Sequence, residues 1–156
     1  MTTLTHVTPA GDAHMVEVGE KPVTRRSATA EGYVRLSPEA LEQVLSRRAH
    51  KGDVLTIAQI AGIQGAKRTA EWIPLCHPLP LDGVDVTLDV VDGSIHIVAT
   101  ARCTGRTGVE MEALTAVTAA ALTVYDMLKA VDRGIRIDGV SLLSKAGGRS
   151  GTWERP

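Results

Sequence analysis

Asp126 and Lys129 are an acid and an amine three residues apart, a spacing that places both on one face of a helix. They lie among Tyr125, Met127 and Leu128, near the end of a long and largely apolar segment. In such surroundings the carboxylate can orient the ammonium and tune its proton affinity, as proton transfer requires. An exposed ion pair without a chemical role is the commoner alternative at this spacing.

His77 follows Cys76 within Ile73–Pro80, a segment that contains three prolines. Prolines exclude regular structure and stiffen the loop, so the imidazole would lose little conformational freedom on binding a ligand. A loop histidine that bonds its own backbone is the equally common alternative. We expect no metal here, because adjacent Cys and His rarely bind one ion and no second paired motif completes four ligands.

Cations gather at expected loop positions although the net charge of the chain is −1. The members of this set are Arg25, Arg26, Lys51 and Lys145. Such a cluster of positive groups on a near-neutral chain indicates a binding site for a small polyanionic ligand. The ordinary alternative is that these cations simply lie on a solvent-exposed surface. Glycine-flanked Arg106-Thr107 precedes Glu110 and Glu112, and its free N–H groups could receive a phosphate. Acids in a first helical turn are also ordinary partners of the helix dipole.

The elements that must position these residues are predicted by periodicity and turn signals. Apolar residues alternate over 28–36, 84–90, 95–103 and 135–142, which predicts strands, and recur at helical spacing over 38–49 and 109–132. A second helix is expected after the cap Asp53, with Leu55, Ala58, Ala61 and Ile63 facing inward. Lys51-Gly52 is expected to separate the first two helices, and Asp92-Gly93 predicts a hairpin turn.

This order of elements predicts an α+β fold of the ferredoxin-like, split βαβ class, an antiparallel sheet with helices on one face. A length of 156 residues predicts one domain over 1–156, with residues 1–14 expected to be flexible. Four aromatic residues and no Phe disfavour an RNA-stacking surface, and the charge disfavours a DNA or membrane partner. No apolar run reaches the ~18–20 residues of a membrane span. Two cysteines and no secretory signal favour a reducing cytoplasm.

Glu112 and Asp126 lie 14 residues apart on the predicted long helix. They point within ~40° of the same direction, but their backbones are separated by ~21 Å of helix rise. A nucleotide-sized ligand could hardly contact both Glu112 and Asp126 within one subunit. If both residues serve one site, the simplest geometry is a site shared between subunits.

Six runs of the chain resemble the cyclic pyranopterin monophosphate synthase family, in order and at the family's spacing. The runs are KGDV (51–54), AGIQ with AKRT (61–64 and 66–69), IPLCHPL (73–79), TGRTGVEMEALT (104–115), YDMLKAV (125–131) and KAGGRSG (145–151). The resemblance covers essentially the whole chain. It implies the second step of molybdenum cofactor biosynthesis, in which 3′,8-cyclo-7,8-dihydro-GTP becomes cyclic pyranopterin monophosphate and pyrophosphate. It also implies a ferredoxin-like subunit in a homohexamer, a trimer of dimers with its active sites between subunits.

The resemblance also implies the residues of the site. Those expected to line the substrate pocket are Leu75, Cys76, His77, Met111 and Glu112, and those expected to complete the site are Arg26, Lys51, Lys129 and Lys145. Asp126 is the implied catalytic residue. We expect Lys51 and Lys129 to transfer protons and Asp126 to orient Lys129. His77, Arg26 and Lys145 would surround the triphosphate, with Glu112 facing guanine N–H groups.

No redox cofactor is expected, because the rearrangement transfers no electrons. The chain also lacks the cysteine cluster that radical chemistry needs, so a separate upstream radical enzyme must supply the substrate. Two other classes stay open at this point: a nucleotide-binding regulatory module, which would bind without turnover, and a metal-dependent phosphohydrolase, which chelation would silence.

Overall fold

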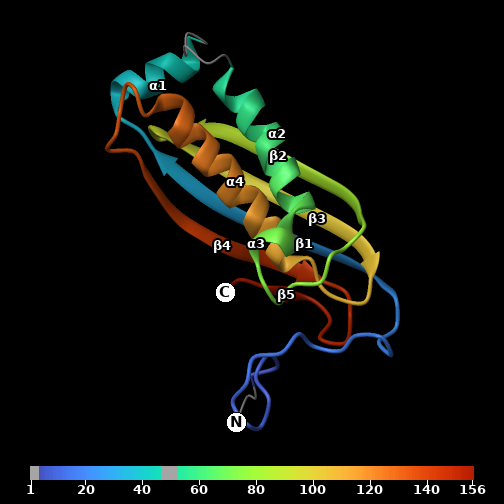
Figure 1. Ribbon diagram of the computed structural model, residues 1–156. Coiled ribbons are helices and arrows are strands. Elements are labelled where there is room, and N and C mark those ends of the chain that lie inside the picture. The colour runs from blue at the N-terminus through green and yellow to red at the C-terminus, as the bar shows by residue number, and fades with distance from the viewer. Residues whose placement is uncertain (1–3, 47–52) are drawn as a thin grey trace.

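The computed structural model describes residues 4–46 and 53–156. Helices cover one face of a twisted sheet, and the other face of the sheet carries no helix among the described residues (Figure 1). The elements in chain order are β1 (Thr24–Arg35), α1 (Pro38–Leu45), α2 (Val54–Lys67), α3 (Thr69–Trp72), β2 (Leu81–Val91), β3 (Ser94–Gly105), α4 (Glu110–Leu128), β4 (Arg136–Ala146) and β5 (Trp153–Glu154). The predicted strands and the irregular Ile73–Pro80 loop are confirmed.

The sheet has the strand order β2-β3-β1-β4-β5, and every neighbouring pair is antiparallel. The first four strands reproduce the predicted ferredoxin-like arrangement, and β5 adds a short edge strand that the sequence did not indicate. The β2–β3 hairpin turns at Asp92 and Gly93, whose φ angles of 47° and 74° suit this dipeptide. The α+β prediction is therefore confirmed.

The core lies between the sheet and the pair α2 and α4. Alternate residues of β1 and β3, among them Ala30 and Ile97, are fully buried beneath α4. Gly32 allows the close approach of that helix, because a Cβ there would lie 2.7 Å from the Val117 side chain. Small residues on the strands thus bring α4, and every functional group it carries, close to the sheet.

The inward face of α2 agrees with the expected one in part. Of the four residues expected to face inward, Ala58 is fully buried, and Leu55 and Ile63 are partly exposed but pack against the core, while Ala61 is partly exposed. The buried positions are Val54, Ala58, Gly62, Gly65 and Ala66. Glycines take the inner face because α2 contacts α4 closely: a Cβ on Gly65 would lie 2.6 Å from that of Ala119.

The helix starts agree with the predicted caps, and two helix ends do not. The hydroxyl of Ser37 accepts the Ala40 N–H, and the carboxylate of Asp53 accepts the Thr56 N–H. The first helix ends at Leu45 rather than near residue 49, and the predicted break at 51–52 lies outside the described residues.

The long helix α4 ends at Leu128 rather than Asp132. The Asp132 carboxylate accepts the N–H groups of Ser37 and Gly134, at 2.8 Å and 2.7 Å. These bonds hold the chain in a turn that leaves the helix axis. Among the described residues, α4 alone has the length and mean hydropathy of a membrane-spanning helix, but most of it is buried, as in the core helix of a soluble domain.

The N-terminal segment extends away from the sheet (Figure 1). A bridge between Val7 and Ala13 closes a small loop within residues 4–14. The flexibility expected for residues 1–14 stays a prediction, and residues 1–3 lie outside the described part of the chain.

Candidate functional site

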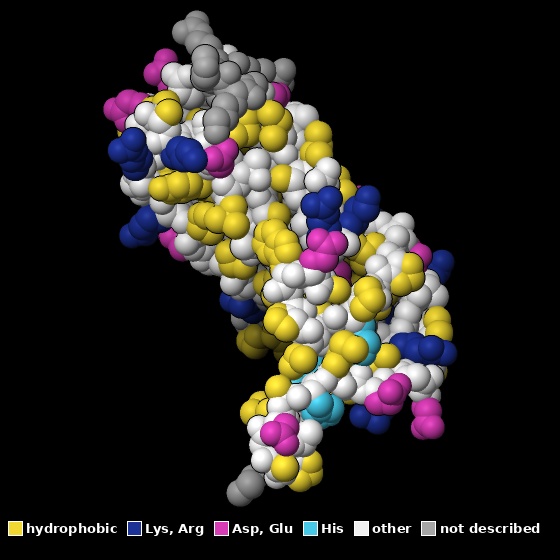
Figure 2. Space-filling view, viewed as in Figure 1, with side chains coloured by type: hydrophobic (Ala, Val, Ile, Leu, Met, Phe, Trp, Pro, Cys, Tyr) yellow, Lys and Arg dark blue, Asp and Glu magenta, His cyan; other side chains and the backbone are white. Residues whose placement is uncertain are grey.

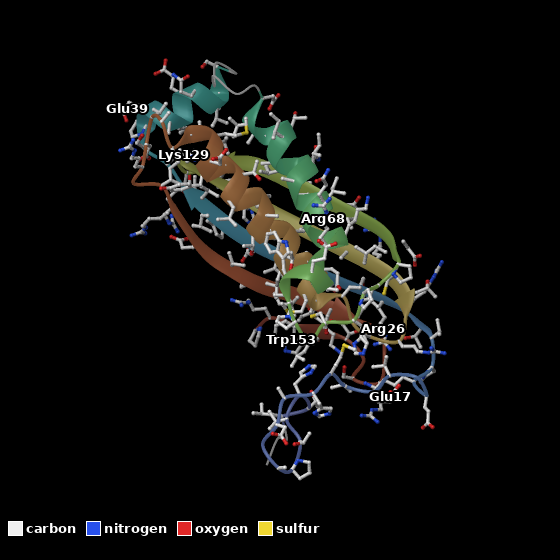
Figure 3. The ribbon with its side chains drawn as sticks, in the orientation of Figure 1. Glu17, Arg26, Glu39, Arg68, Lys129 and Trp153 are labelled. Atoms are coloured by element: carbon white, nitrogen blue, oxygen red, sulfur yellow. The ribbon has the colours of Figure 1, made fainter. Side chains whose placement is uncertain are left out.

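The described members of the expected site form two groups, at opposite ends of α4. Arg26 and Lys129 mark the two ends, far apart along the molecule (Figure 3). The first group, here called the Glu112 cluster, consists of Arg26, Leu75, Cys76, His77, Met111, Glu112 and Lys145. The second group, the Asp126 pair, consists of Asp126 and Lys129. Lys51, an expected proton-transfer residue, lies outside the described residues.

Glu112 is the most deeply buried acid of the described chain, with 4% of its surface exposed. Burial raises the pKa of its carboxyl to about 7, against the opposing effect of a backbone N–H bond, and the charge of Glu110 raises it further. The first turn of α4 and the segment around Thr69 and Pro78 enclose this carboxyl in a small pocket. A carboxyl that titrates near neutral pH can both take up and release a proton.

Arg26 is held in a fixed orientation at the end of β1. Its Nε donates to the Gly105 carbonyl oxygen at 3.0 Å, and a terminal nitrogen donates to that of Arg106 at 3.2 Å. The guanidinium also lies so close to Gly148 that a Cβ there would overlap it. A guanidinium has five N–H donors, so three can still bind an anion such as a phosphate.

Two thiols flank the Glu112 carboxyl. Cys103 pairs with Arg26 across β1 and β3, and Cys76 lies in the proline-rich loop just before His77. Burial raises the pKa of both thiols, and the charge of Glu112 raises it further. Both therefore remain neutral thiols near pH 7, so Cys76 is suited to line a pocket and not to act as a nucleophile.

An open cavity of about 510 Å³ lies at this end of the sheet. Its lining consists of Arg25, Arg26, Ser27, Asp82, Arg102, Cys103, Ala146 and Gly147. Asp82 and Arg102 were not expected at the site. The register of β1 on β3 pairs Ser27 with Arg102, and β2 places Asp82 beside the same end of β3. The pairing of β1 with β3 lies beyond local sequence signals.

Lys145 reaches this end of the molecule from β4. It pairs with Ala28, two residues along β1 from Arg26, so both cations leave the same face of the sheet. Its Nζ donates to the Gly151 carbonyl oxygen at 2.9 Å and to the hydroxyl of Ser150. The sequence pattern gave no separate indication of these two acceptors.

The Asp126 pair is a direct ion pair, with Lys129 Nζ 2.6 Å from Asp126 Oδ1. Both side chains are about half exposed, at 55% and 53%. The hydrogen bond and the charge of Asp126 raise the pKa of Lys129, the opposite of the shift that a general base needs. In the single chain Lys129 is therefore a firmly protonated ammonium, suited to donate a proton or to stabilise an anion.

A groove of about 460 Å³ leads along α2 and α4 to Asp126. Its lining consists of Ala61, Gln64, Gly65, Arg68, Trp72, Ala119, Leu122, Thr123 and Asp126. Large apolar side chains lie exposed on and beside it, among them Ile60, Trp72 and Leu122. Hydrophobic side chains are prominent over this helix-covered face (Figure 2). Gln64 and Arg68 were not expected here, although their spacing of four residues places them on one face of α2.

Comparison with known proteins gives one consistent result. The profile of the MoaC family matches residues 15–148. A protein of Thermomicrobium roseum named cyclic pyranopterin monophosphate synthase is 60% identical, over 99% of this chain and 95% of its own length. Proteins of the same name from Chloroflexus aurantiacus and Cereibacter sphaeroides are 56% and 55% identical, over 98% and 99% of this chain and 95% and 98% of their own lengths.

Proposed function

This chain belongs to the MoaC family, and we propose from that premise that it converts cyclised dihydro-GTP into cyclic pyranopterin monophosphate and pyrophosphate. It is a lyase of molybdenum cofactor biosynthesis. Rearranging a purine into a pterin requires ring opening, ring closure and several proton transfers at heteroatoms. Forming a cyclic phosphate while pyrophosphate leaves places negative charge on the leaving oxygens, where cations help most.

The observation that carries this proposal is the Glu112 cluster. A buried carboxyl with a pKa of about 7 lies at the same end of the sheet as two oriented cations, Arg26 and Lys145. The carboxyl can exchange protons with the base of a nucleotide, and the cations match a triphosphate. This combination suits a reaction that moves protons on a ring and expels pyrophosphate from the same molecule.

The roles that we propose for the individual residues are those that the family resemblance implies. Arg26, His77 and Lys145 bind the triphosphate, while Leu75, Cys76 and Met111 line the pocket. Glu112 faces the N–H groups of the base. Lys51 and Lys129 transfer protons, and Asp126 orients Lys129 through their 2.6 Å bond. The raised pKa of Lys129 in the single chain makes it a proton donor. Burial by a neighbouring subunit would lower that pKa and allow Lys129 to accept a proton.

The complete site contains the Glu112 cluster of one subunit and the Asp126 pair of another. The two groups are carried near opposite ends of α4, and the groove beside Asp126 exposes apolar side chains that a second copy would bury. The assembly is a homohexamer, a trimer of dimers. It works in the reducing cytoplasm, which suits its two free thiols, and receives its substrate from an upstream radical enzyme.

The test is turnover of the purified protein with cyclised dihydro-GTP, made by an upstream radical enzyme, under anaerobic conditions with and without a chelator. Pyrophosphate and the fluorescent pterin formed on oxidising the product are followed together. Equal yields of both support the synthase. Binding without either product identifies a nucleotide-binding module instead. Phosphate release that the chelator stops identifies a metal-dependent phosphohydrolase.

A further inference from the structure

The C-terminal turn of the chain binds the ammonium of Lys145. The nitrogen donates to the Gly151 carbonyl oxygen at 2.9 Å and to the Ser150 hydroxyl. An ammonium has three N–H donors, so these two bonds leave one N–H for a ligand. A lysine without such partners would sample many rotamers, which binding a ligand would have to restrict.

The turn that provides these acceptors is anchored on both sides. Before it, Gly147 and Gly148 adopt φ angles of 93° and 73° and lie against β1, where a Cβ on either would overlap Arg25 or Arg26. After it, β5 returns to the sheet edge and pairs Trp153 with Lys145. The position of Ser150 is therefore fixed relative to the strand that carries Lys145.

The C-terminal residues strengthen this anchor. The backbone N–H of Arg155 donates to the Leu143 carbonyl oxygen at 2.8 Å, and its Nε donates to that of Leu142 at 3.0 Å. These bonds extend the contact with β4 beyond the two-residue strand β5. The tail thus makes several bonds to the sheet, all of which support a turn whose hydroxyl and carbonyl meet a single ammonium.

We propose that Ser150 is a positioning residue for substrate binding. With the Gly151 carbonyl, its hydroxyl fixes the ammonium of Lys145 on the sheet face that Arg26 shares, so that the third N–H meets a phosphate oxygen of the substrate. The inference rests on the proposed function of Lys145 as a triphosphate ligand. Because Arg26 is oriented by two carbonyl oxygens and Lys145 by a carbonyl and a hydroxyl, both cations are oriented before substrate arrives.

The first experiment measures Lys145 itself, without substrate. The full chain is treated with an amine-acetylating ester, and acetylation of Lys145 is followed by mass spectrometry. Ser150→Ala removes one acceptor that surrounds the nitrogen, so acetylation should become about fivefold faster, while Ser150→Thr keeps the hydroxyl and should stay within about twofold of the parent. Ser141→Ala, on the same strand, serves as the control.

The second experiment measures anaerobic steady-state turnover of the same variants. Ser150→Ala should raise KM about tenfold with kcat changed less than about twofold, and Ser150→Thr should restore KM. A chain that ends at Thr152 keeps Ser150 but loses β5, and its KM should also be higher than that of the parent.

Two results overturn the inference. Equal acetylation of Lys145 in the parent and Ser150→Ala shows that the hydroxyl does not hold the ammonium. Faster acetylation with an unchanged KM shows that holding the ammonium does not serve the substrate. A parent chain that makes no pterin at all overturns the proposed function instead, and the acetylation comparison still decides whether Ser150 holds Lys145.

Discussion

Glu112 and Asp126 lie on the same helix, 14 residues apart, near opposite ends of α4. A helix rises ~1.5 Å per residue, so their backbones are separated by ~21 Å. Glu112 is buried between the sheet and the proline-rich loop, whereas Asp126 is exposed beside an apolar groove. The two carboxylates therefore have opposite environments, and each suits a different task in the proposed site between subunits.

The first prediction concerns Glu112 and the pH dependence of stability. The pKa of the Glu112 carboxyl is about 7 in the folded chain, whereas that of a free glutamate carboxyl is 4.5. The folded chain binds more protons between these values, so the free energy of unfolding should fall as pH rises through that window. The fall should be on the order of 3 kcal/mol, and Glu112→Gln should abolish most of it.

Urea unfolding at pH 5 and pH 8, at one fixed protein concentration, would check this prediction. Glu39→Gln is the matched control, because Glu39 is an exposed acid in the first turn of α1. The control should follow the parent at both values. Parallel pH profiles for the parent and Glu112→Gln would show that the buried carboxyl keeps its ordinary pKa.

The second prediction separates the catalytic from the structural contribution of the Asp126 pair. Asp126→Asn should lower kcat/KM at least about a hundredfold, because the amide neither holds Lys129 by charge nor assists its proton transfer. The free energy of unfolding should change by less than about 0.5 kcal/mol, since the ion pair is about half exposed.

Asp138→Asn provides the comparison for the second prediction. Asp138 makes an ion pair of 2.7 Å with Arg35, on the opposite side of the sheet from the helices. Its substitution should leave turnover within about twofold of the parent, as expected of an exposed pair without a chemical role. Equal turnover of Asp126→Asn and the parent would exclude Asp126 from the reaction.

The third prediction concerns the contact of α2 with α4 that supports both halves of the site. A Cβ on Gly65 would lie 2.6 Å from the Cβ of Ala119, so Gly65→Ala should destabilise the fold by about 2 kcal/mol. Adding Ala119→Gly removes the clashing methyl and should recover part of that loss, because the Thr115 carbonyl oxygen would still lie 3.2 Å from the new Cβ. Thermal unfolding of the two single variants and the double variant gives the coupling between the positions. If the effects of the two substitutions on the free energy of unfolding simply add, the helices are farther apart than the structure shows.

Local sequence signals predicted the fold where the structure is itself local. Alternating apolar residues identified the strands, and Asp92-Gly93 identified the hairpin because only a few dipeptides suit positive φ angles. The end of α4 was predicted four residues too late. Beyond that end, the Asp132 carboxylate accepts the N–H of Ser37, 95 residues away in the chain, and no local pattern reveals this contact.

Candidate members of the site could be proposed from the sequence, but their geometry could not. Motifs identified Arg26, Glu112 and Lys145 as candidates. The strand register places Arg26 and Lys145 at one end of the sheet, and the first turn of α4 carries Glu112 at that end. The pKa of about 7 for Glu112 results from burial by segments distant in sequence. The acceptors of Lys145 likewise depend on a tail held by β5, a strand of two residues that is too short to show periodicity.

The most direct test of the shared site is complementation between two inactive variants. Asp126→Asn and Glu112→Gln chains, each with turnover below about 1% of the parent, are unfolded, mixed in equal amounts and refolded together. In a two-fold symmetric pair that carries one chain of each kind, one of the two sites receives both substitutions and the other receives neither. Random mixing should therefore restore about a quarter of the parental turnover. Turnover no higher than that of the separate variants would contradict a site built from the Glu112 cluster of one subunit and the Asp126 pair of another.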